Sequence, residues 1–143
     1  MTGDGDSETL HATCVALGLK GLLILGPSGS GKSGLALALM ASGCMLVADD
    51  RTVVTRHGGH LFATPPAGLE GRIEARGVGI LNAAHVASTR LTLAVDLGRA
   101  ETERLPGFHE FECLGLRLPL VLGPISAHFP ASVLQYLRAG RSA

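Results

Sequence analysis

The stretch KGLLILGPSGSGKSGLALALM, residues 20–40, decides the fold. It begins with an apolar run typical of a buried strand and continues through a glycine-rich turn. A Leu- and Ala-rich segment typical of a helix follows, and Gly43 closes it. Residues 26–33 read GPSGSGKS, which is a complete G-x-x-x-x-G-K-[ST] pattern. The stretch therefore predicts a strand, a phosphate-binding loop (P-loop) and a helix in succession.

The chemistry of this pattern is specific. Glycines let the backbone curl so that successive N–H groups point at one anion, and the helix adds its positive N-terminal end. Lys32 supplies a mobile charge for the β- and γ-phosphates, and the Ser33 hydroxyl ligates Mg²⁺. A glycine-rich turn that binds nothing would explain neither residue, so we expect nucleoside triphosphate binding, although the pattern does not choose the reaction. The expected nucleotide-binding residues are Gly26, Pro27, Ser28, Gly29, Ser30, Gly31, Lys32 and Ser33.

The next apolar run, MLVADD at 45–50, ends in two carboxylates. Asp49 follows Lys32 by 17 residues, and an acidic residue at such a strand end holds Mg²⁺ in P-loop proteins, directly or through water. Asp50 is then not needed for the metal. It is either a turn residue, since Asp favours turns, or a general base that accepts the proton of an attacking hydroxyl. The spacing alone leaves both alternatives open, and a paired aspartate favours a kinase over a simple hydrolase.

The rest of the chain is rich in strand-like segments and poor in helices. Strands are expected over 11–18, 91–98 and 115–123, a hairpin over 51–66, an extended segment broken by glycines over 69–82, and a helix over 126–140. The strands on either side of the first helix should pair in parallel, because a strand–helix–strand crossover joins them. The expected fold class is α/β, with a P-loop in a mixed β-sheet that carries few helices.

Composition restricts the class of protein. A chain of 143 residues with 46% hydrophobic and 17% charged residues is expected to form one globular domain. A formal net charge of zero weakens the case for a nucleic-acid partner, which would need a basic surface, and no apolar run is long enough for a membrane span. The polar residues 1–10 lack the basic start of a signal peptide and are interpreted as a flexible leader, with the domain over 11–143.

The three cysteines indicate the cellular compartment. Cys14, Cys44 and Cys113 are odd in number, far apart and without metal-ligand spacing. Such a pattern is typical of a reducing cytoplasm, where disulfides are rare. We expect each cysteine to be a small buried apolar side chain.

Further segments make the pattern more specific than a P-loop alone. His11 stands fifteen positions before Gly26, MLVADD supplies an Ala-Asp-Asp strand end, and IEARGVGILN follows at 73–82. Together these residues closely resemble the HPr kinase/phosphorylase family from about residue 11 to 125. Ala75 replaces the isoleucine of the family's Glu-Ile-Arg-Gly-x-Gly segment.

The resemblance implies roles for individual residues. The implied catalytic residues are Asp50, Lys32, His11 and Arg104, and the implied metal ligands are Ser33 and Glu74, beside Asp49. Asp50 matches the base that takes the proton of a serine hydroxyl, and Lys32 matches the phosphate-binding lysine. His11 either orients Asp50 or contacts phosphate. Each of three residues also has a simpler interpretation without a catalytic role. His11 would be a structural histidine, Glu74 a solvated carboxylate and Arg104 an exposed surface residue.

The implied activity is transfer of the γ-phosphate of ATP, with Mg²⁺, to a serine of HPr. HPr is the small phosphocarrier protein of the phosphotransferase system. A small-molecule P-loop kinase remains an alternative, because the residues around Asp50 do not specify a protein substrate. A non-catalytic ATP-sensing regulatory module is a second alternative.

Two departures from the family stand out. Full-length members carry a separate N-terminal domain, whereas ten residues precede His11, as in short proteobacterial forms that act on HPr or its nitrogen-related paralogue. Members assemble as hexamers, so a homo-oligomer is implied, although this departure leaves the assembly open. The family's Pro-Val-Arg-Pro-Gly-Arg-Asn-like segment corresponds to GPISAHFPAS at 123–132, which lacks both arginines and the asparagine. That basic segment is tied to removal of the serine phosphate by inorganic phosphate, so we expect weak or no phosphorylase activity.

Overall fold

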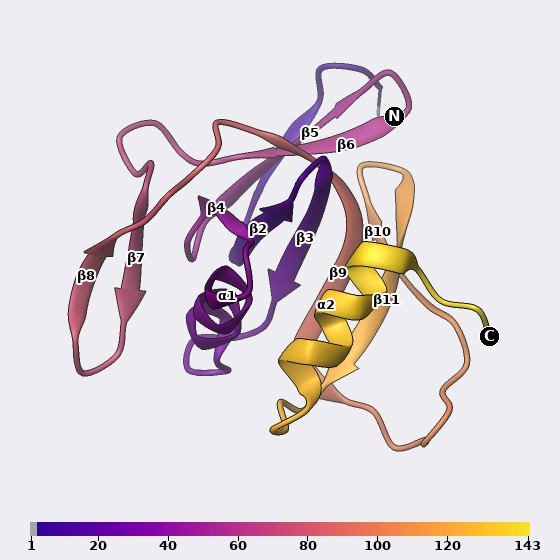
Figure 1. The fold of residues 1–143 in the computed structure, drawn as a ribbon. Coiled ribbons are helices and arrows are strands. Elements are labelled where there is room, and N and C mark those ends of the chain that lie inside the picture. Colours follow the sequence, from indigo (N-terminus) through magenta and orange to yellow (C-terminus); the bar gives the residue numbers. More distant parts are fainter. Residues whose placement is uncertain (1–2) are drawn as a thin grey trace.

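The fold is a mixed β-sheet with helices on one face (Figure 1). The computed structural model describes residues 3–143, and in this part of the chain nine strands form one sheet, two form a separate hairpin and two helices occur. The central strands are β2 (Ala12–Leu17), β3 (Lys20–Leu25) and β9 (Thr89–Ala100), with β4 (Met45–Ala48) at the edge beside β2. The expected α/β class, with a mixed sheet and few helices, is confirmed.

The strand–helix–strand unit has an unexpected pairing. β3 leads through the P-loop into α1 (Lys32–Ala41), and α1 leads to β4. β3 and β4 point in the same direction, but β2 lies between them and pairs antiparallel with both. The predicted parallel pairing of β3 with β4 is therefore wrong. Its physical reason is that β2 and β3 form a tight hairpin, so β2 already occupies the edge that β4 would need.

Both faces of the central strands are buried. Successive residues of β3 point to opposite faces, so Leu22 and Ile24 face the helices while Leu23 faces away from them. α1 and α2 (Phe129–Ala139) cover the first face, and Figure 1 shows them side by side in front of the sheet. Neither helix in residues 3–143 is long and apolar enough to cross a membrane. Burial on both faces explains the continuous apolar run from which a buried strand was predicted.

An antiparallel ribbon covers part of the second face. It consists of β1 (Ser7–Leu10), β5 (Thr52–His57) and β6 (His60–Thr64). The prediction of a flexible leader over 1–10 is wrong for Ser7–Leu10, because these residues pair with the edge of β5, where Ser7 Oγ and Thr55 Oγ1 lie 2.8 Å apart. Residues 1 and 2 of that leader lie outside the described residues.

The remaining strands complete the sheet and one projecting arm. β11 (Leu116–Gly123) pairs parallel with β9, and β10 (His109–Cys113), which the sequence did not predict, pairs with β11. The extended segment predicted over 69–82 is instead a hairpin of β7 (Arg72–Ala75) and β8 (Gly79–Asn82). This β7–β8 arm projects beside α1, on the side away from α2 (Figure 1).

Candidate active site

The P-loop connects β3 to the N-terminus of α1. Gly26 and Gly31 have φ values of 151° and 100°, a region that side-chain-bearing residues rarely adopt. A Cβ on Gly26 would also collide with the Ser30 hydroxyl. That hydroxyl is buried and has no hydrogen-bond partner among the described residues, and a buried polar group without a partner is costly. The loop thus has the glycine geometry and the polar lining that suit a bound phosphate.

Lys32 folds back over this loop. Its side chain is only 6% exposed, and Nζ donates hydrogen bonds to the carbonyl oxygens of Gly26 at 2.8 Å and Pro27 at 3.1 Å. Both acceptors are neutral. A polyphosphate would offer the ammonium group charged acceptors, which form hydrogen bonds about twice as strong as neutral ones.

Asp49 is held by three donors at the end of β4. Its Oδ1 accepts hydrogen bonds from Ser33 Oγ at 2.7 Å and Thr13 Oγ1 at 3.2 Å, and its Oδ2 accepts one from the Glu74 amide at 2.9 Å. The Ser33 oxygen keeps its lone pairs while its hydrogen points to Asp49. The carboxylate therefore orients the serine so that its oxygen can ligate a cation.

The donor set fits Mg²⁺ held together with phosphate. Within residues 3–143, no three His, Cys, Asp or Glu side chains form a group that could hold a metal by themselves. Mg²⁺ usually keeps several waters and binds through one or two carboxylates plus substrate phosphates. Ser33, Asp49 and the exposed Glu74 side chain would supply the protein's share of such a site.

Asp50 adopts a left-handed backbone conformation at the following turn. Its φ is 64°, which is uncommon for any residue with a side chain but tolerated by Asp and Asn. Its amide donates to Thr13 Oγ1 at 3.1 Å, and its Oδ1 lies 2.7 Å from His11 Nε2. The two alternatives for Asp50 are therefore compatible, because the residue makes the turn and presents a carboxylate that is in hydrogen-bond contact with His11.

Two adjoining cavities meet at Asp50. The first, of about 480 Å³, is lined by the P-loop and its flanking residues, namely Ser28, Gly29, Gly31, Lys32, Ser33, Gly34, Leu37, Asp50, Glu74 and Arg76. The second, of about 420 Å³, is lined by Thr9, Leu10, His11, Ser28, Asp50 and Arg51. Five of the predicted catalytic and metal residues, Lys32, Ser33, Asp50, Glu74 and His11, are thus brought together, with Asp49 directly beneath them. Asp50 and Ser28 are common to both cavities.

Arg104 lies apart from these cavities. It is exposed in the segment between β9 and β10 and is not among the residues that line either cavity. Arg141 fixes the end of this segment by donating to the carbonyl oxygens of Pro106 and Gly107, and its guanidinium lies 4.1 Å from the centre of the Phe108 ring. The catalytic role of Arg104 stays a prediction.

Arg76 and Thr13 were not predicted from the sequence as site residues. Arg76 lines the first cavity and belongs to the quoted 73–82 segment, so that motif was a signal for it. Thr13 is fully buried in β2 and hydrogen-bonds both Asp49 and the Asp50 amide. Nothing local distinguishes Thr13 from any other strand threonine.

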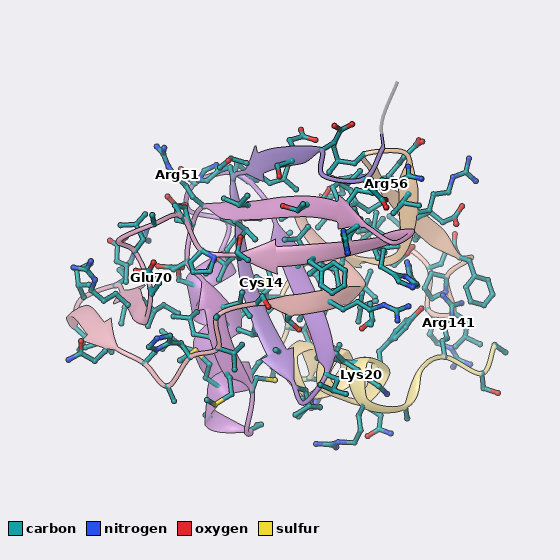
Figure 2. All side chains as sticks on the ribbon, turned by 90° about the horizontal axis from the view of Figure 1, so that it is seen from above. Cys14, Lys20, Arg51, Arg56, Glu70 and Arg141 are labelled. Atoms are coloured by element: carbon teal, nitrogen blue, oxygen red, sulfur yellow. The ribbon has the colours of Figure 1, made fainter. Side chains whose placement is uncertain are left out.

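The remaining features lie away from the site. A cavity of about 660 Å³ lies between α2 and the β10–β11 hairpin, and its lining includes Lys20 and Arg141, which Figure 2 labels. Its lining includes none of the predicted site residues among the part of the chain described.

Cys14, Cys44 and Cys113 are buried and free, as predicted. Burial raises the pKa of each thiol, and the pKa of Cys113 rises to about 11.

Comparison with known proteins gives consistent matches. The family described as HPr Serine kinase C-terminal domain matches residues 5–118. The HPr kinase/phosphorylase of Malacoplasma penetrans (strain HF-2) is 32% identical over 83% of this chain and 44% of the relative. The protein of the same name from Xylella fastidiosa (strain M12) is 35% identical over 82% of this chain and 42% of the relative. The chain thus spans less than half the length of these relatives.

A solved structure has the same fold. The Hpr(Ser) kinase/phosphatase from Coxiella burnetii aligns with a TM-score of 0.78 at 26% sequence identity. The alignment covers 92% of this chain and 88% of that chain. The resemblance identified in the sequence is therefore confirmed in both sequence and structure.

Proposed function

Since this chain belongs to the family of HPr serine kinase C-terminal domains, we propose that it is an ATP- and Mg²⁺-dependent kinase that phosphorylates a serine of HPr or of a related phosphocarrier protein. One observation carries the proposal. Asp50, hydrogen-bonded to His11, lines both the P-loop cavity and the cavity next to it. A base at this junction can reach a phosphate on one side and an incoming hydroxyl on the other.

The proposed reaction assigns a task to each residue. Asp50 accepts the proton of the serine hydroxyl as the serine oxygen bonds to the γ-phosphorus, and the bond to the β,γ-bridging oxygen breaks to release ADP. His11 holds the Asp50 carboxylate through the 2.7 Å contact. Lys32 stabilises the negative charge that develops on the transferred phosphoryl group. Mg²⁺, when bound, neutralises charge on the β- and γ-phosphate oxygens.

Two alternatives use the same site differently. A small-molecule kinase would place a metabolite hydroxyl beside Asp50, and an ATP-sensing module would bind nucleotide without transfer. The exposure of Asp50 and His11, whose side chains are 59% and 47% exposed, favours a protein acceptor, because a small-molecule kinase needs an enclosed acceptor site.

One assay distinguishes the proposed protein kinase from these two alternatives. The protein is incubated with Mg²⁺, γ-labelled ATP and purified HPr or its nitrogen-related paralogue. Label on a carrier serine supports the proposal, whereas label on a metabolite from a cell extract supports the small-molecule kinase. Tight ATP binding without transfer to any carrier contradicts the proposal and supports the sensing module.

The reverse reaction is proposed to be weak or absent. Residues 124–128, Pro-Ile-Ser-Ala-His, carry no Arg or Lys, so they offer no permanent positive charge for an additional inorganic phosphate. Serine-phosphorylated HPr and inorganic phosphate should yield little pyrophosphate with this protein. Rapid formation of pyrophosphate contradicts this part of the proposal.

The setting of the enzyme is also proposed. Three buried free thiols fit the reducing cytoplasm, and the neutral net charge gives no support for a nucleic-acid partner. We expect this P-loop domain to form a homo-oligomer, with the family as the support for this expectation. Light scattering on the purified protein measures the oligomeric state.

A further inference from the structure

The segment at 124–128, between β11 and α2, lies directly against the P-loop. A Cβ placed on Gly31 would come within 3.0 Å of Ile125 Cδ1, so the isoleucine forms one flank of the phosphate-binding loop. Ile125 is nevertheless 41% exposed. An apolar side chain of this size beside a phosphate-binding loop presents a surface that a ligand can cover.

The order of the strands explains this position. β3, β9 and β11 are parallel neighbours, so the segments that follow them all emerge at the same end of the sheet. In Figure 1 the P-loop and the segment before α2 both lie at the lower end of the sheet. Ligands of open α/β sheets bind outside the carboxyl ends of the strands, where such segments meet.

The direction in which a bound triphosphate lies across the loop can be deduced from the charged residues. Glu74 and Arg76 belong to the β7–β8 arm and line the same cavity as Asp50, so the reacting γ-phosphate belongs on the side of α1 where the arm lies. The other end of the ligand must then leave the loop on the opposite side. α1 lies between the arm and α2 in Figure 1, and the 124–128 segment leads into α2, so the ligand would leave the loop toward Ile125.

The chemistry of the segment suits a neutral group. Residues 124–128 are exposed and contain no Asp, Glu, Lys or Arg. We propose that Ile125 forms the apolar floor of a nucleoside subsite and contacts the base or ribose of a bound nucleoside triphosphate. This inference rests on the proposed function and names the part of the chain that distinguishes a nucleotide from an inorganic polyphosphate.

Comparison of ATP with inorganic triphosphate tests the inference. Titration calorimetry with Mg²⁺ measures the affinity of each ligand for the wild type, Ile125→Ala, Ile125→Leu and the control Leu19→Ala, whose side chain is 91% exposed in a remote turn. Losing a partly buried apolar contact should weaken ATP binding by about three- to tenfold in Ile125→Ala. Triphosphate binding should stay within about twofold, while Ile125→Leu and Leu19→Ala should bind ATP like the wild type.

Each other outcome has a defined meaning. Equal loss of affinity for ATP and triphosphate in Ile125→Ala, or unchanged ATP affinity, overturns the nucleoside subsite but leaves the proposed function standing. A wild type that binds triphosphate as tightly as ATP also overturns the subsite alone. A wild type that binds neither ligand refutes the proposed function and this inference together.

Discussion

Replacing Asp50 by asparagine removes the proposed base while preserving its shape. Asparagine tolerates the left-handed backbone conformation that Asp50 adopts at φ 64°, whereas alanine would add strain there. The asparagine side chain can still hydrogen-bond His11, because it retains an oxygen at the position that lies 2.7 Å from Nε2. The substitution therefore changes one property, the ability to accept a proton.

The expected loss of rate is large and the expected loss of stability is small. A positioned general base contributes roughly 10²–10⁴-fold, which corresponds to about 3–5 kcal/mol of transition-state stabilisation. The contact between Asp50 and His11 joins side chains that are 59% and 47% exposed, and exposed ion pairs contribute only about 0–1 kcal/mol. Asp50→Asn should thus fold normally, bind ATP normally and transfer phosphate at least about a hundredfold more slowly.

Single-turnover transfer of labelled phosphate to HPr measures this rate. Urea unfolding and ATP titration, run in parallel, separate lost chemistry from lost folding or lost binding. The matched control is Asp4→Asn, which removes an exposed aspartate far from both cavities and should leave all three measurements unchanged. Transfer by Asp50→Asn at a rate within threefold of the wild type would refute the assignment of Asp50 as the base.

Three further predictions concern the folded chain. Leu22→Ala should lower the free energy of unfolding by about 2–5 kcal/mol in urea, because the side chain is fully buried between β3 and the helices; a smaller loss would contradict that packing. The three thiols should resist iodoacetamide in the folded protein and react only after unfolding, since burial raises their pKa; mass spectrometry detects the adducts. The pKa of Glu101 is lowered, first by the hydrogen bond from the Glu103 amide and second by that from His109. These bonds therefore stabilise the folded protein at neutral pH, and this stabilisation is lost as the pH falls through the lowered pKa. The urea midpoints of wild type and Glu101→Gln should accordingly differ at neutral pH and converge in acid.

Local patterns predicted the elements that hold the site. The strand, P-loop and helix over 20–40 and the strand at 45–48 are all present, because glycine positions and apolar periodicity are properties of adjacent residues. The positions of Asp49 and Asp50 could be predicted because both residues come directly after that strand. The grouping of Glu74 with the P-loop came from the family resemblance and not from periodicity.

The β10–β11 hairpin was missed although it is local, because only one residue of β10 is buried. Other errors concern pairing between distant segments. β1 has no buried residue and forms because β5, more than forty residues later, offers it an edge, which no local pattern records. The pairing of β4 with β2 depends in the same way on which edge is already occupied. Thr13 was missed for a related reason, since its two partners lie 36 and 37 residues further along the chain.

The contacts of Lys32 with its own loop affect how strongly different anions bind there. An anion that takes the ammonium group from the carbonyl oxygens of Gly26 and Pro27 exchanges one set of hydrogen bonds for another, so its affinity for Lys32 is a difference between the two sets. A singly charged anion such as chloride gains little from that exchange, whereas a polyphosphate gains a charged acceptor and the loop amides at once. The resting loop thus discriminates by ligand charge before any nucleoside contact is made.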